Sequence, residues 1–256
     1  MTLLLAAACA VLGLLVGSFL NVVIVRVPEK RSVVTPRSHC PRCSAQLRDR
    51  DNIPVVSWLL LRGRCHSCAE PIPIRYPLVE LGTGVLFAAM AARFGADWAL
   101  PGYLVFVSAL LAVSAIDLER FLVPNRIVYP SLVASLALLG VAALLEPDGG
   151  AFVRALVGAV AASGGLFALA LLYPRGMGMG DVKLALLLGL YLGWLSLGHV
   201  VLGLFLGFLL GSVVGIALLV AGVRGRKDHL PFAPFLATGA VLAVLVGQPV
   251  LDWYLG

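Results

Sequence analysis

Long runs of apolar residues, each close to the length of a membrane span, recur along almost the whole chain. A helix needs about 20 apolar residues to cross the hydrocarbon core of a bilayer. The pattern therefore predicts about eight membrane helices. They cover residues Leu3–Val25, Pro77–Ala92, Pro101–Ile116, Ile127–Leu145, Phe152–Tyr173, Val182–Leu197, His199–Val223 and Phe232–Leu251.

Short polar segments rich in glycine and proline separate these runs, for example Val123–Asn125 and Glu146–Gly150. The weakest boundary lies at Ser196–Gly198, where one long hairpin would reduce the count to seven helices. The first run lacks a basic segment in front of it and continues past any small-residue cleavage site, so we expect it to remain as a membrane helix. The fold class predicted is an all-α polytopic membrane protein.

The composition excludes most soluble classes of protein. Hydrophobic residues make up 61% of the chain and charged residues 12%, with a mean hydropathy of +1.01. The formal net charge of +6 does not require a nucleic-acid partner. Basic residues beside the anionic headgroups of a lipid bilayer account for it.

The positions of lysine and arginine predict which side of the membrane each loop occupies, because basic residues are retained in short cytoplasmic loops. Ten of the nineteen basic residues lie between Arg26 and Arg75. If that segment is cytoplasmic and eight helices alternate, only Arg93 and Arg154 face outward. We therefore expect residues 26–75 on the cytoplasmic side of the membrane and both termini outside.

Residues 26–76 form the only sizeable segment outside the predicted helices. The sequence thus divides into a first helix (1–25), a cytoplasmic lobe (26–76) and a seven-helix membrane core (77–256). The lobe holds two Cys-x-x-Cys pairs, a spacing typical of a tetrahedral zinc site. Disulfides are the alternative, but thiols in a reducing cytosol favour structural zinc. The predicted ligands are Cys40, Cys43, Cys65 and Cys68.

Two aspartates are the candidates for chemistry. Asp117 ends the third predicted helix and Asp181 opens the sixth, so both carboxyls are expected at the same depth near the cytoplasmic interface. Two carboxyls that share a proton can activate a water and protonate a leaving amine. Each acid could instead simply end a helix among the headgroups, and a proton-coupled transporter would use both as a relay.

A glycine-rich segment precedes Asp181. Gly176, Gly178 and Gly180 remove side chains where an extended substrate backbone would need to approach. A nucleotide-binding loop would require a preceding strand, which the apolar runs do not predict. Lys183 lies two residues after Asp181 on a helix and faces away from it, so an interfacial or substrate-related role is expected.

The sequence resembles the type IV prepilin peptidase family. Gly178–Asp181 is similar to its Gly-x-Gly-Asp signature, and Asp117–Pro124 is similar to its first aspartate motif. Further similarity covers segments near the first helix, in the lobe and before the last helix. These segments are Gly17–Val23 with Arg26 and Pro28, Asn52–Pro54, Ser57–Leu59, Arg75–Glu80 and Leu230–Phe235. Two departures are visible, because many members have Asp where Asn125 stands and Gly where Ala233 stands.

The resemblance implies an aspartic endopeptidase with Asp117 and Asp181 as its catalytic pair. Its substrates would be type IV prepilins or the pseudopilins of protein secretion, whose leader peptides are cut at the cytoplasmic face of the inner membrane. In many members the new N-terminal amine is then methylated with S-adenosylmethionine. No cofactor-binding residue is identified from the sequence, and a peptidase without methyltransferase activity remains the alternative.

Overall fold

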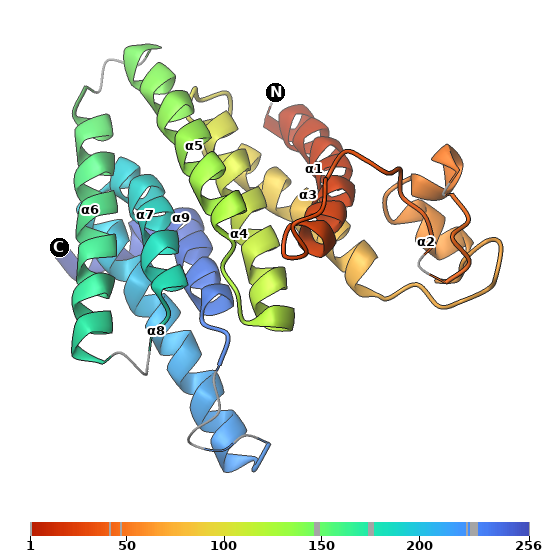
Figure 1. Ribbon diagram of the computed structural model, residues 1–256. Coiled ribbons are helices and arrows are strands. Elements are labelled where there is room, and N and C mark those ends of the chain that lie inside the picture. Colours follow the sequence, from red (N-terminus) through yellow and green to blue (C-terminus); the bar gives the residue numbers. More distant parts are fainter. Residues whose placement is uncertain are drawn as a thin grey trace. The chain divides into compact units, whose positions relative to one another are not determined.

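The computed structural model describes residues 2–40, 42–46, 48–145, 149–173, 177–223, 225 and 230–255. Figure 1 shows that the elements within this part of the chain are helical. In chain order they are α1 (Thr2–Arg26), the 3₁₀ helix η1 (Asp49–Asn52), α2 (Val56–Leu60), α3 (Arg75–Phe94), α4 (Leu100–Arg120), α5 (Asn125–Leu145), α6 (Gly149–Leu172), α7 (Met179–Leu195), α8 (Leu197–Val220) and α9 (Ala233–Leu255).

The predicted fold class is confirmed, and a long helix lies on each of the eight apolar runs. Among the described residues, seven helices are long and apolar enough to cross a membrane. The eighth, α7, has 17 residues and twelve of them are buried. A helix that is apolar on all sides is one that protein surrounds, so α7 forms the centre of its neighbours' packing.

The predicted boundary at Ser196–Gly198 is confirmed, because α7 ends just before Ser196 and α8 begins just after it. Ser196 adopts an extended conformation between α7 and α8, with φ −168° and ψ 162°. Its N–H donates to the Leu192 carbonyl oxygen and ends α7, while its hydroxyl accepts the N–H of His199 and caps α8. One residue therefore separates two helices, which excludes the seven-helix alternative.

The chain divides into two compact units, residues 1–100 and 101–256. In the first unit, α1 and α3 pack closely through two glycines of α1 that lie four residues apart. A Cβ atom added at Gly13 would lie 2.7 Å from the Thr83 carbonyl oxygen, and one added at Gly17 would lie 2.6 Å from the Glu80 Cα. Such small residues let membrane helices approach at backbone distance.

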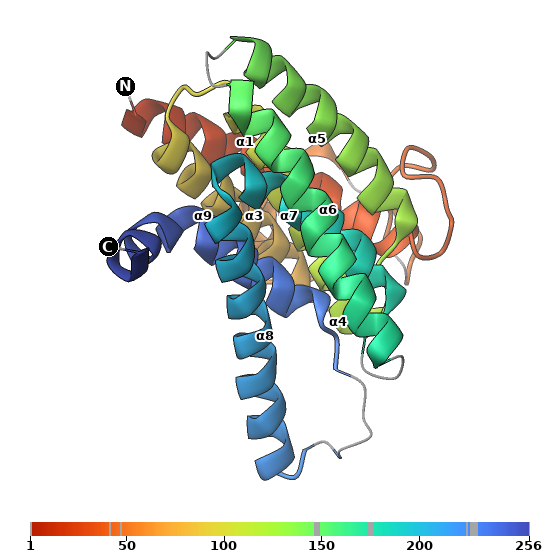
Figure 2. The same ribbon diagram turned by 90° about the vertical axis from the view of Figure 1, so that its left-hand side faces the viewer.

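In the second unit, α6 and α7 lie side by side, as Figures 1 and 2 both show. Their contact also depends on glycine. A Cβ atom added at Gly158 would lie 2.5 Å from the Gly189 carbonyl oxygen and 2.9 Å from the Gly193 Cα. No side chain fits between these backbones.

A buried polar cluster joins α4, α5 and α7. The Tyr103 hydroxyl donates to the Tyr191 carbonyl oxygen at 2.9 Å. The Tyr191 hydroxyl donates to the Gly102 carbonyl oxygen at 2.6 Å and lies 2.7 Å from the hydroxyl of Ser135. Hydrogen bonds between apolar helices fix their register, so this cluster sets α4 relative to α7, the two helices that carry the aspartates.

The glycine contact between α6 and α7 generates a stability prediction. Gly158→Ala should destabilise the protein by about 1–3 kcal/mol, because the added methyl group overpacks a closed interface. Gly165→Ala is the matched control, since it lies on the same helix with nothing within 4 Å of the added Cβ. Unfolding midpoints of the two variants in detergent would be compared with wild type. Equal midpoints for both variants would contradict the packing role.

Candidate active site and metal centre

Asp117 lies in the last turn of α4 and is 5% exposed. Its Oδ2 accepts the backbone N–H of Ala233 at 3.0 Å. Ala233 is the first residue of α9, where backbone N–H groups have no partner within the helix. The carboxyl of Asp117 thus caps α9, and α9 in turn holds the carboxyl in place.

Asp181 lies in the first turn of α7 and is 8% exposed. Its N–H donates to the Gly178 carbonyl oxygen at 3.1 Å, which closes the turn that begins the helix. The carboxyls of Asp117 and Asp181 lie close enough to interact as like charges. The structure therefore brings together two buried acids that are 64 positions apart in the chain.

The glycines before Asp181 have different surroundings. A Cβ atom added at Gly180 would lie 2.7 Å from the Cβ of Val123, so this glycine makes room for the turn that follows α4. Among the described residues, a Cβ atom added at Gly178 would have only the Asp181 Oδ2, at an ordinary 3.5 Å, and the Gly180 N within 4 Å. The described residues therefore leave space beside the acid at Gly178. Gly176 lies outside the described residues.

Lys183 is on the exposed side of α7. Its Nζ donates to the Asn125 Oδ1 at 3.1 Å and links the beginning of α7 to the beginning of α5. The sequence predicts an interfacial or substrate-related role for Lys183. Asn125 is one of the two positions at which this chain departs from the family pattern. A neutral amide at position 125 accepts this bond, so the contact does not require an aspartate there.

Ala233 is the residue at this site whose part was not foreseen. It is fully buried, and its backbone rather than its side chain makes the contact with Asp117. The segment Leu230–Phe235 is visible in the sequence as a motif before a helix. Which acid accepts the N–H of Ala233 depends on how α4 and α9 pack. No local sequence pattern predicts that packing.

The four predicted zinc ligands lie together in the lobe. The sulfur atoms of Cys40, Cys43, Cys65 and Cys68 are all within 4.8 Å of one another, and all four cysteines are free. Zinc–sulfur bonds of about 2.3 Å in a tetrahedron place the sulfurs about 3.8 Å apart. The Cys40 and Cys68 sulfurs are 3.8 Å apart. This arrangement could hold a metal ion without large movement.

The two cysteine pairs occupy similar turns. Within the first turn, the N–H of Ser44 donates to the Cys40 carbonyl oxygen at 2.9 Å, and within the second, the N–H of Ala69 donates to the Cys65 carbonyl oxygen at 2.9 Å. Ser44 and Ala69 have positive φ values of 57° and 58°. The matching geometry indicates one turn type used twice.

The first of these turns also favours a thiolate. The backbone N–H groups of Cys43 and Arg42 point at the Cys40 sulfur and lower its pKa to about 6. Because the thiolate is the form that binds metal, this turn is suited to supply a ligand near neutral pH.

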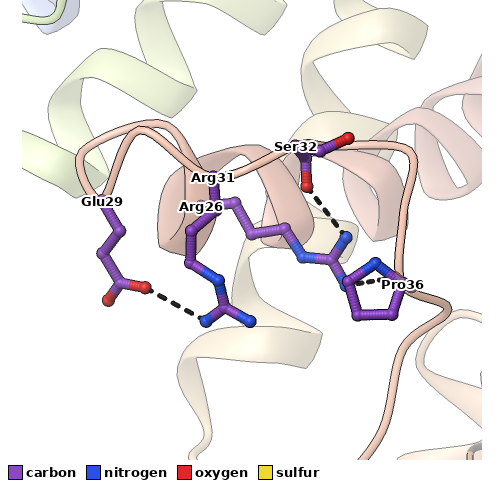
Figure 3. A network of polar contacts seen from close by, with 5 residues as sticks. All are labelled: Arg26, Glu29, Arg31, Ser32 and Pro36. Carbon is purple, nitrogen blue, oxygen red and sulfur yellow. Dashed lines mark hydrogen bonds and ion pairs between the residues drawn. The ribbon is translucent and has the colours of Figure 1, made fainter.

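Arg26 attaches the beginning of the lobe to the end of α1, as Figure 3 shows. Its buried guanidinium donates to the carbonyl oxygens of Ser32 at 3.0 Å and Pro36 at 2.7 Å. The nearby ion pair between Glu29 and Arg31, at 3.3 Å, is solvent-exposed and contributes little to stability. Arg26, one of the residues behind the family resemblance, thus positions the first loop of the lobe.

Comparison with known families defines the class of protein. Residues 11–94 match the family described as "Bacterial Peptidase A24 N-terminal domain", and residues 104–220 match the "Type IV leader peptidase family". The chain therefore belongs to the type IV leader peptidase family, and the resemblance inferred from its motifs is confirmed. No solved structure matches the chain significantly.

Three relatives illustrate the similarity, and each is named prepilin leader peptidase/N-methyltransferase. The Burkholderia pseudomallei (strain 1026b) protein is 38% identical, over 95% of this chain and 86% of its own. The Aeromonas salmonicida (strain A449) protein is 35% identical, over 95% and 91%. The Bacillus subtilis (strain 168) protein is 36% identical, over 96% of each. Together with the apolar helices, family membership makes this chain a multi-pass inner-membrane protein.

Proposed function

We propose that the protein is an aspartic endopeptidase that removes the leader peptide of type IV prepilins or pseudopilins and then methylates the new N-terminus. The observation that carries the peptidase activity is the meeting of two buried carboxyls, Asp117 and Asp181, in a member of the type IV leader peptidase family. The names of the relatives support both activities.

In the proposed cleavage, one aspartate is ionised and the other protonated. The carboxylate takes a proton from a water, whose oxygen attacks the carbonyl carbon of the scissile peptide bond. The protonated carboxyl gives its proton to the leaving amine as the carbon–nitrogen bond breaks. The hydrogen bond from the Ala233 N–H holds the carboxyl of Asp117 in place during these transfers. No observation favours the alternative of a proton-coupled transporter.

We place the dyad and the lobe on the cytoplasmic side and both termini outside, as the distribution of basic residues predicts. We propose that leader cleavage takes place at the dyad and that methyl transfer takes place in the first compact unit, residues 1–100. The chemistry that the methyl donor, S-adenosylmethionine, supplies is an electrophilic methyl group. Cavities and buried polar groups of that unit suit a site for this transfer.

We further propose that Cys40, Cys43, Cys65 and Cys68 hold one structural zinc ion. The closeness of the four sulfurs supports this assignment. A lobe with two short helical elements and few buried apolar residues gains much of its stability from such a metal.

The dyad predicts the effect of two isosteric substitutions. Asp117→Asn and Asp181→Asn should each reduce leader cleavage by about 10²–10⁴-fold or more, because the remaining carboxyl cannot act as both acid and base. Asparagine at position 117 can still accept the Ala233 N–H, so the fold should survive. Mass spectrometry of a purified prepilin substrate measures cleavage. Asp252→Asn, at an exposed site bonded to Gln248, is the matched control. Full cleavage by either dyad variant would disprove the assignment.

The glycines preceding Asp181 should respond differently to alanine. Gly180→Ala should lower both the unfolding midpoint and cleavage, because its methyl group collides with Val123. Gly178→Ala should leave the midpoint unchanged and lower kcat/KM, since its added methyl group would occupy the space proposed for the substrate backbone. Both quantities are measured on the same detergent preparations. Unchanged kcat/KM in Gly178→Ala would argue against substrate approach at this glycine.

The zinc proposal predicts about one equivalent of zinc per purified chain. Cys40→Ser and Cys65→Ser should each lower the zinc content below about half an equivalent, because removing a thiolate opens the site. Cys9→Ala is the control, since Cys9 is buried in α1 away from the cluster and should keep the metal. Elemental analysis with thiol titration decides the matter. Disulfide-bonded, zinc-free wild-type protein would refute the proposal.

A further inference from the structure

A third buried acid lies in the first unit, separate from the dyad's helices. Glu80 is on α3 and is 8% exposed. Its Oε2 accepts the N–H of Val55 at 2.7 Å, and the side chains of Ser18 and Asn21 from α1 also hydrogen-bond to it. Within the described part of the chain, no basic side chain forms an ion pair with Glu80. Its partners are all neutral.

A buried carboxylate with only neutral partners is costly, and such groups in membrane helices usually serve a function. The same polar cluster contains a buried atom without a hydrogen-bond partner. Asn21 is 3% exposed, and its Nδ2 donates to the Tyr76 carbonyl oxygen, while its Oδ1 has no hydrogen-bond partner. Both features indicate that a polar ligand completes this site.

The bond from Val55 to Glu80 lies at a strained turn. Val55 has φ 62° and ψ −48°, and the Val56 N–H reaches the Pro54 carbonyl oxygen at 2.6 Å. This is a γ-turn with positive φ, which a β-branched residue adopts only when its surroundings enforce it. Glu80 is one of the groups that hold it. Such strain is commonly kept where it positions functional groups.

Glu80 also lines a cavity of about 230 Å³ in this unit. Its wall includes Val55, Trp58 and Tyr76. A second cavity of about 380 Å³ shares Arg48 and Asn52 with the first, and it is lined by Ser18, the hydrogen-bond partner of Glu80. Two cavities that share wall residues, with the Glu80 carboxyl in the wall of one, suit a reaction between two substrates.

We propose that Glu80 is the catalytic base of the methyl transfer and that the cavity beside it receives the N-terminal amine of the cleaved substrate. This inference rests on the proposed methyltransferase activity and assigns its site. The aromatic wall at Trp58 suits a cationic ammonium group. Trp58 is held in place by a 3.1 Å bond from its Nε1 to the Ile72 carbonyl oxygen.

The proton and electron balance assigns a specific task to the carboxylate. An ammonium nitrogen has no free electron pair, so it must first give one proton to Glu80, which passes that proton to water and is a carboxylate again before the transfer. The resulting amine then attacks the methyl carbon of the sulfonium donor, and the carbon–sulfur bond breaks with its electron pair left on a neutral thioether. The product is a methylated secondary ammonium beside the Glu80 carboxylate.

The direction of charge movement explains why the carboxylate should face the amine rather than the sulfonium. During transfer, positive charge leaves sulfur and develops on nitrogen. A carboxylate beside nitrogen stabilises the transition state, whereas one beside sulfur stabilises the starting state and slows the reaction. Glu80 next to the amine therefore accelerates the step.

Glu80→Gln tests the proposal, because glutamine can still accept the Val55 N–H but carries no charge. We expect methyl transfer to fall by about 10²-fold or more, with leader cleavage and the unfolding midpoint close to wild type. Equilibrium dialysis gives a second readout, the ratio of affinities for S-adenosylmethionine and the neutral S-adenosylhomocysteine. That ratio should not change. Glu29→Gln, in the exposed ion pair with Arg31, is the matched control.

Several outcomes would overturn the inference. Normal methyl transfer by Glu80→Gln would exclude a catalytic base, and selective loss of affinity for the sulfonium would place the carboxylate beside sulfur. If Glu80→Gln lowers the unfolding midpoint, Glu80→Asp decides: per folded molecule, a base predicts faster methyl transfer by Asp than by Gln, and a structural role predicts a loss with Asp at least as large as with Gln, since Asp is too short to reach Val55. Wild-type protein that cleaves but never methylates would contradict the proposed function instead.

Discussion

The hydrocarbon core of a membrane offers no hydrogen bonds, so a polar group buried there without a partner in the chain is costly. This constraint explains why the polar contacts cluster at helix ends. The carboxyl of Asp117 takes the free N–H of Ala233, and Ser196 satisfies backbone groups of two helices at once. Where the helices run through their middles, glycines replace polar contacts, and backbones meet directly at Gly158 and Gly189.

Under this constraint, each acid that remains buried is informative. Asp117 and Asp181 lie in one unit and Glu80 in the other, and all three are at least nine-tenths buried. The first two face each other's charge, which suits the sharing of one proton. Glu80 has neutral donors only. The two kinds of environment correspond to the two kinds of chemistry proposed, hydrolysis by a pair and proton abstraction by a single base.

Much of this architecture could be predicted from the sequence, because apolar run length and cysteine spacing are local signals. The eight helices and the meeting of Cys40 with Cys68 follow from such signals. The contact of Gly180 with Val123 and the bond from Ala233 to Asp117 could not be predicted, since both depend on which helices become neighbours. Glu80 shows the same limit. Glu80 accepts the N–H of Val55, a residue 25 positions away, and no periodicity in the sequence connects the two positions or predicts the burial of Glu80.

The paired cysteine turns would place the proposed zinc ion at the two ends of a loop that contains η1, α2 and the strained Val55. Closing a loop of this length restricts the unfolded chain by about 3 kcal/mol if a metal acts as a disulfide does. The dyad, in contrast, lies on long helices outside this loop. Zinc starvation would therefore loosen the wall of the Glu80 cavity and leave the aspartates unaffected. A cell short of zinc would be expected to export pilins of the correct length that lack their terminal methyl group.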